Sequence, residues 1–189
     1  EDNAQTVGIR KFFGEGQPLF EYEAPSTDKR GWRTYDRMDE TVAKLEQKLA
    51  KLPGGCPDVL LGFSQGANMI TSIAARAERS LPGALPRFRS IVLLSPSLPG
   101  WVASQPSVFG EALTNKAHKL LTPALIGWCS SDTVAKDGPK EVMKMYVNPR
   151  DAEHHGPGHR PLPASSTDNA AHRAYIDMVK QFIEEHCRK

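Results

Sequence analysis

The pentapeptide Gly62-Phe63-Ser64-Gln65-Gly66 has the residue types and spacing that can make a serine hydroxyl nucleophilic. It matches the pattern G-x-S-x-G, in which the serine lies on a tight turn between a strand and a helix and projects from the sheet edge. The flanking glycines remove side chains that would collide where strand and helix approach closely. The backbone N–H of Gln65 would then lie at the helix N-terminus, where it can donate to an oxyanion. The alternative is an ordinary turn capped by Ser64, but a cap does not need glycine on both sides.

A serine becomes a good nucleophile only when a base takes its proton and a carboxylate orients that base. In α/β-hydrolases the acid and then the histidine follow the serine along the chain. Asp132 follows the apolar segment 124–128 through the short loop Cys129-Ser130-Ser131, where a strand end can deliver a carboxylate. We therefore predict Asp132 as the acid. Asp137 is its nearest competitor, but it precedes Gly138-Pro139 and is expected to begin the next helix.

The predicted base is His159, within the segment His154–His159, which its glycines and proline mark as a loop. His155 is the rival base. His155 and His159 also lie four residues apart, a spacing that aligns two metal ligands only on a helix, and the glycines and proline oppose a helix here. We therefore predict neither a metal nor a cofactor. The remaining histidines are predicted to lie at the surface: His118, His172 and His186.

Short apolar segments alternate with amphipathic segments, which predicts an α/β fold with a mostly parallel sheet and helices on both faces. The predicted strands cover residues 19–22, 58–63, 90–94 and 124–128. The predicted helices run through Met38, Val42, Leu45 and Leu49, from Gln65 into the low eighties, from Gly138-Pro139 past Val142, Met143 and Tyr146, and along a final stripe at Tyr175, Met178, Val179, Phe182 and Ile183. In such a fold, loops that carry chemistry lie at the carboxyl ends of the strands.

The composition is that of a globular domain. The 189 residues are enough for one hydrophobic core and too few for two ordinary ones, so we predict a single domain over 1–189. The net charge of +2 offers no basic face for nucleic acid, and no apolar run reaches the ~18 residues of a membrane helix. Three cysteines at unrelated spacings predict neither a metal site nor a disulfide framework. They favour a reducing compartment, the cytoplasm first, with the mitochondrial matrix as the alternative.

Several motifs together resemble the FSH family of serine hydrolases, over nearly the whole chain. The stretch 62–67 has the family's elbow, and His155-Gly156-Pro157-Gly158-His159 resembles its H-P-G-G-H motif. The other similar segments are Gly8-Ile9-Arg10-Lys11 (first helix), Tyr22-Glu23-Ala24-Pro25 (the D-A-P strand end, with Glu23 for Asp), Arg30-Gly31-Trp32 (R-x-W) and Ser131-Asp132-Thr133-Val134 (acid loop). The resemblance implies an α/β-hydrolase with Ser64, Asp132 and His159 as its triad, and it leaves His155 as a loop residue.

Two features depart from the family pattern. The proline that the family has three residues after the catalytic histidine is displaced here to Pro161 or Pro163. The family also opens with a strand ending in L-H-G, whose loop supplies the second oxyanion donor, and this sequence begins after that point. Because omitting the strand would leave backbone groups of the sheet unpaired, we expect the sequence to be an incomplete or N-terminally unassigned form. A strand supplied by a partner protein is the alternative.

The resemblance implies hydrolysis of a small-molecule carboxylic ester or thioester through an acyl-enzyme intermediate. Trp32, Trp101 and Phe109 are the candidate substrate-pocket residues. The segment 95–121 either forms an acyl pocket over Ser64 or packs on the core. Two rival functions stand beside hydrolysis: an acyltransferase that uses the same triad, and a catalytically inactive hydrolase-fold scaffold or subunit of a larger complex.

Overall fold

The fold was analysed in a computed structural model of the chain. It describes residues 25–27, 29, 33–35, 37–86, 88–109, 119–155, 158–162 and 170–187. The predicted strand over residues 19–22 therefore lies outside the described residues. Within the described ranges, none of the helices combines the length and the apolar character that crossing a membrane requires.

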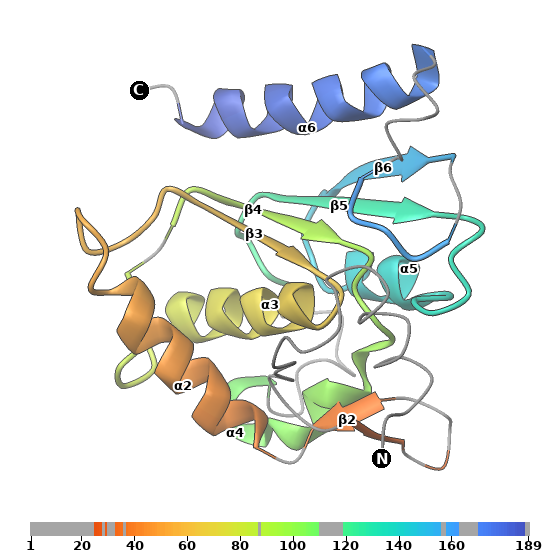
Figure 1. The fold of residues 1–189 in the computed structure, drawn as a ribbon. Helices are drawn as coiled ribbons and strands as arrows, with labels where there is room; N and C mark the ends of the chain where they lie inside the picture. The colour runs from red at the N-terminus through yellow and green to blue at the C-terminus, as the bar shows by residue number, and fades with distance from the viewer. Residues whose placement is uncertain are drawn as a thin grey trace, which may run out of the picture.

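Four parallel strands form the main sheet, as the alternating pattern predicted (Figure 1). They are β3 (Val59–Phe63), β4 (Ser90–Leu94), β5 (Ala124–Cys129) and β6 (Arg150–His154), hydrogen-bonded in that order. The first three follow the predicted strands to within one residue. The fourth was not predicted: the composition placed His154 in a loop, whereas it is the last residue of β6.

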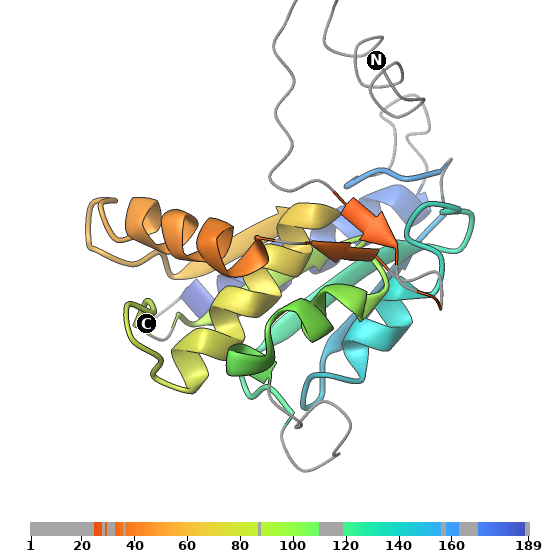
Figure 2. The same ribbon diagram turned by 90° about the horizontal axis from the view of Figure 1, so that it is seen from below.

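Helices cover both faces of this sheet, which confirms the predicted fold class. Helices α2 (Met38–Leu49), α3 (Gln65–Glu78) and α5 (Gly138–Met143) lie on one face, and α6 (Ala170–Cys187) lies on the other (Figure 1). Figure 2 shows α2 and α3 side by side across the first face. Helix α3 ends at Glu78, a few residues before the predicted end, and Tyr146 lies beyond the end of α5.

The two faces of the central strands belong to two separate hydrophobic clusters. In β4 the side chains alternate, so that Ile91 and Leu93 pack toward α3 while Val92 and Leu94 pack toward α6. All four are 2% exposed or less, as expected for a parallel strand covered on both faces. The same alternation directs the odd-numbered residues of β5 toward α6, where the α-carbon of Gly127 faces the Tyr175 hydroxyl.

Strand β3, which precedes the candidate nucleophile, lies at one edge of the described sheet, and β6 lies at the other. The apolar sequence of β3 is typical of a central strand, yet Leu61 is 54% exposed on the α6 side. Leu60, on the opposite side, is buried against the α3 cluster.

The segment after β4 contains a 3₁₀ helix, η1 (Pro99–Ser104), and a short helix, α4 (Pro106–Phe109). A small antiparallel hairpin of β1 (Pro25–Thr27) and β2 (Arg33–Tyr35) contacts η1 through β2. Trp101 and Phe109 are 0% and 2% exposed and pack edge to face at 5.6 Å within the main core. Their predicted pocket role is corrected: both side chains fill the core. Trp32 lies outside the described residues.

Candidate active site

Ser64 occupies the turn between β3 and α3, with the strained backbone that the pentapeptide predicts. Its φ is 53° and its ψ is −119°, and its N–H donates to the carbonyl of Leu94 in the neighbouring strand at 2.8 Å. A Cβ on Gly62 would lie 2.7 Å from backbone atoms of Gly66, so the strand and helix approach only because residue 62 has no side chain. A Cβ on Gly66 would meet nothing within 4 Å. The close approach therefore requires glycine at position 62, as predicted, but not at position 66.

Asp132 follows β5 through a tight turn that fixes its carboxylate. One oxygen, Oδ1, accepts hydrogen bonds from the backbone N–H groups of Val134 and Ala135, both at 2.9 Å. The residue is 5% exposed. Burial alone would raise the pKa of this carboxyl, but the hydrogen bonds from Ala135 and His159 outweigh it, and the pKa lies below its ordinary value. Asp132 is therefore held as a carboxylate with its second oxygen free to orient a base.

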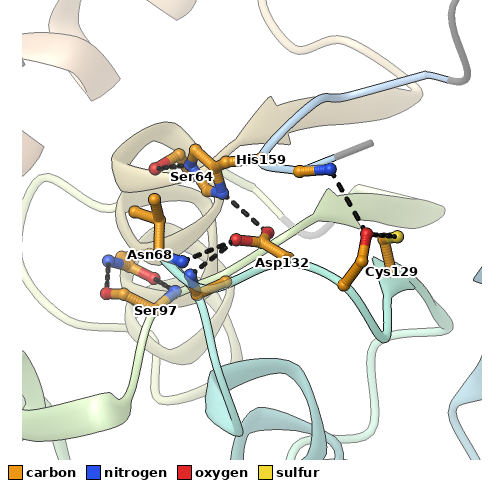
Figure 3. Close-up of polar contacts among 10 residues, drawn as sticks. Ser64, Asn68, Ser97, Cys129, Asp132 and His159 are labelled. Carbon is orange, nitrogen blue, oxygen red and sulfur yellow. Dashed lines mark hydrogen bonds and ion pairs between the residues drawn. The ribbon is translucent and has the colours of Figure 1, made fainter. Parts of the chain in front are cut away.

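His159 lies between the serine and the acid (Figure 3). Its Nδ1 is 2.7 Å from Asp132 Oδ2, and its Nε2 is 2.8 Å from Ser64 Oγ. The ring of Phe63 packs against the imidazole, with the centroids 4.7 Å apart. The structure thus brings the three predicted residues into one hydrogen-bonded row, in which the carboxylate fixes the tautomer that leaves Nε2 able to accept the serine proton.

A second contact joins the acid loop to the residue before the base. The Gly158 N–H donates to Ser131 Oγ at 3.3 Å, and Ser131 Oγ is 3.1 Å from the buried thiol of Cys129 (Figure 3). Sequence reasoning singled out Ser131 only as part of the acid loop. The position of Ser131 next to Asp132 is the one feature of the sequence that points to this contact with Gly158.

The rival site residues lie elsewhere. His155 is exposed, and its backbone carbonyl accepts a hydrogen bond from His172 Nε2. Asp137 directly precedes α5, as predicted. The prediction that His172 lies at the surface is wrong, because α6 places it against the sheet with 5% exposure. His186 is half-buried and bonded to the Phe182 carbonyl at 2.8 Å, whereas His118 lies outside the described residues.

A chain of buried polar side chains, which the sequence did not reveal, runs beneath the nucleophile turn. Asn68, one helical turn after Ser64, exchanges two hydrogen bonds with Ser97: Nδ2 to Oγ at 2.6 Å and Oδ1 from the backbone N–H at 3.2 Å (Figure 3). Further along α3, Ser72 donates to Gln105 Oε1 at 2.6 Å, and Gln105 donates to Asp39 Oδ1 at 2.8 Å. These bonds fix α3 against the segment that follows β4.

Gln65, the predicted oxyanion donor, is the first residue of α3. Its backbone N–H therefore belongs to the N-terminal turn of a 14-residue helix, where the helix dipole favours negative charge. Across the described ranges, no three His, Cys, Asp or Glu side chains gather in a way that could hold a metal ion. The three cysteines are free thiols.

Several solved structures share this fold. Acyl-protein thioesterase 2 of Zea mays is 18% identical, with 93% of this chain and 75% of that chain covered and a TM-score of 0.60. Esterase PE8 is 22% identical, with 92% and 74% covered and a TM-score of 0.58. A variant of SOBER1 from Arabidopsis thaliana is 16% identical, with 86% and 68% covered and a TM-score of 0.52. At these identities the likeness establishes the α/β-hydrolase fold.

Among curated proteins, none matches the sequence. The family described as "Serine hydrolase (FSH1)" matches residues 9–171, a range that includes Ser64, Asp132 and His159. The match extends over most of the 189 residues. The chain belongs to the FSH1 family of serine hydrolases.

Proposed function

We propose that Ser64, His159 and Asp132 are the catalytic triad of an enzyme that hydrolyses carboxylic esters or thioesters. The observation that carries the proposal is the unbroken hydrogen-bonded row from Ser64 Oγ through His159 to Asp132, with distances of 2.8 and 2.7 Å. Both distances lie within the range in which a base can take a proton from its nucleophile.

In the first step Ser64 Oγ attacks the carbonyl carbon of the substrate while His159 Nε2 accepts the hydroxyl proton. Asp132 accepts a hydrogen bond from His159 Nδ1 and stabilises the imidazolium that forms. The carbonyl oxygen becomes an oxyanion, and the N–H of Gln65 is the donor we assign to it. A donor of this kind lowers the barrier by about 3 kcal/mol in comparable sites. His159 then gives its proton to the leaving alcohol or thiol, and an acyl-enzyme remains.

In the second step water replaces the leaving group. His159 Nε2 accepts a proton from water, whose oxygen attacks the acyl carbon, and the bond to Ser64 Oγ breaks with return of the proton to the serine. The products are the carboxylic acid and the regenerated enzyme. An acyltransferase would follow the same path with an alcohol or amine in place of water.

The substrate class is supported by the family and by the names of its structural relatives. Esterase PE8 and the maize acyl-protein thioesterase share the fold, and their names give ester and thioester bonds as their targets. Three free thiols support a reducing compartment for the protein, the cytoplasm or the mitochondrial matrix.

The first experiment is labelling of the folded protein with a fluorophosphonate, which reacts covalently with activated serines. We expect labelling of the wild type and none of Ser64→Ala. Ser80→Gly is the matched control, because Ser80 lies just beyond the other end of α3 and has a similar positive φ of 50°. It should label as the wild type does. A folded wild type that does not react would favour the inactive scaffold.

A second measurement distinguishes water from an alcohol or amine as the acceptor of the acyl group. Release of p-nitrophenol from esters of graded acyl length, and of thiol from matched thioesters, gives kcat/KM for each substrate with water as acceptor. Labelling without turnover, followed by acyl transfer once an alcohol or amine is added, would identify an acyltransferase instead.

A further inference from the structure

The catalytic base proposed above lies on a connecting segment, so its position depends on what holds the backbone around it. An imidazole that acts as a base must stay within hydrogen-bond distance of two partners. A backbone shift of even 1 Å at such a residue lowers the rate of the reaction. The bond from Gly158 to Ser131 Oγ, at 3.3 Å, is one restraint. His172, a buried histidine of α6, supplies a second restraint.

The end of β6 fixes the chain before the connecting segment begins. His154, the last residue of β6, is 2% exposed, lies on the α6 side of the sheet, and packs edge to face on Tyr175 with centroids 4.9 Å apart. The segment that carries the base therefore starts from a strand end packed against α6.

His172 lies in the first turn of α6. It is 5% exposed, and its Nε2–H donates to the backbone carbonyl of His155, four residues before the base. Since a carbonyl only accepts, the proton must be on Nε2 of His172. The backbone before the base is thus tied to α6 at His155 and to the acid loop at Gly158.

Packing alone does not explain a histidine at position 172. A buried imidazole costs free energy unless its N–H finds an acceptor, and an apolar side chain of similar size would fill the same space without that cost. The acceptor for the Nε2–H of His172 is a backbone carbonyl of the segment that leads to the base.

We propose that His172 is a positioning residue for the base: by binding the backbone carbonyl of His155, it holds the segment that places His159 between Ser64 and Asp132. The proposal rests on the proposed role of His159 as the base. His172 is 5% exposed, so we expect it to act on the chemical step and to leave substrate binding unchanged.

The test compares a variant that loses the donor with one that keeps it. His172→Leu fills the space without an N–H, whereas His172→Gln places an amide N–H near the position of Nε2. We expect kcat to fall by about 10- to 100-fold in the apolar variant, with KM within twofold of the wild type. The glutamine variant should keep kcat within about threefold. His186→Leu is the control, because His186 also lies in α6 and bonds a backbone carbonyl at 2.8 Å, that of Phe182, yet should leave kcat unchanged.

Folding is checked by the melting temperature of each variant, and kinetics are measured well below it. Wild-type kcat in a folded apolar variant would overturn the proposal, as would an equal loss in His186→Leu or a rise in KM alone. If His172→Leu does not fold, a folded His172→Gln variant with a tenfold loss of kcat overturns it. An inactive wild type would instead refute the proposed function, so the two failures are distinct.

Discussion

Replacing Asp132 by asparagine tests the proposed triad most sharply, because the structure fixes which way the new amide must face. Oδ1 of Asp132 accepts from two backbone N–H groups, those of Val134 and Ala135. In Asp132→Asn the amide oxygen must take this place, since the NH₂ group cannot accept. The NH₂ group then faces His159 Nδ1 at the position where Oδ2 lies now, 2.7 Å away.

The swapped polarity forces the wrong tautomer. With an NH₂ donor in front of it, His159 Nδ1 must accept, so the proton moves to Nε2, the atom that has to take the proton of Ser64. In comparable triads this change lowers kcat by about 10⁴-fold with the geometry intact, or about 5 kcal/mol in activation free energy. Both backbone bonds remain in the asparagine variant, so its unfolding free energy at neutral pH should stay much closer to that of the wild type than its kcat does.

Asp132→Ala is the matched comparison. It leaves the N–H groups of Val134 and Ala135 without their acceptor, which costs about 1–3 kcal/mol of stability, and it also loses activity. The assay is kcat for a p-nitrophenyl ester together with urea unfolding of each variant. The reasoning fails if folded Asp132→Asn keeps kcat within tenfold of the wild type.

Two further predictions concern stability. A Cβ in Gly127→Ala would lie 2.2 Å from the Tyr175 hydroxyl, so we expect the unfolding free energy to fall by about 1–3 kcal/mol. The double variant with Tyr175→Phe should recover part of this loss. Additive effects of the two substitutions in a double-mutant cycle measured by denaturation would contradict this prediction. Arg76→Met leaves the carboxylate of Glu46, 1% exposed, without its partner at 2.9 Å, and should cost about 3–5 kcal/mol at neutral pH. Burial already raises the pKa of Glu46 above 4.5, and Arg76 opposes this rise. The raised pKa favours folding fully below pH 4.5, and this benefit is lost as the pH rises. The cost of Arg76→Met should therefore shrink in acid, and a cost that does not change with pH in urea unfolding would refute this prediction.

The elements with a strong apolar period were predictable from the sequence. Strand β4 covers the predicted residues 90–94, and α2 and α6 follow their apolar stripes. Strand β6 was missed because its two inward residues are Ala152 and His154, which give no apolar alternation within a charged segment. Its backbone pairing with β5, which is a tertiary contact, makes it a strand.

The candidate site was predictable where a motif sets local geometry and not where distant elements meet. The pentapeptide placed Ser64 on its turn, and chain order pointed to Asp132 and His159. The roles of Trp101 and His172 were misjudged for a common reason. An aromatic ring suits a core as well as a pocket, and a histidine in a polar segment gives no sign of burial until helix packing is known. Asn68 and Ser97, 29 residues apart, form their pair only in the folded chain.

The wide separation of the site residues along the chain has a consequence for how the protein folds. Ser64 and His159 are 95 positions apart, and His159 and Asp132 are 27 apart, so their contacts close only after β3, β4, β5 and β6 have paired through their crossovers. Non-local parallel pairing is slow, because each loop-closure entropy must be met before its contacts form. Helical signal should therefore return early when the denatured chain is diluted into buffer. Reactivity of Ser64 toward a fluorophosphonate should return only with the slowest phase, so it reports when the sheet is complete.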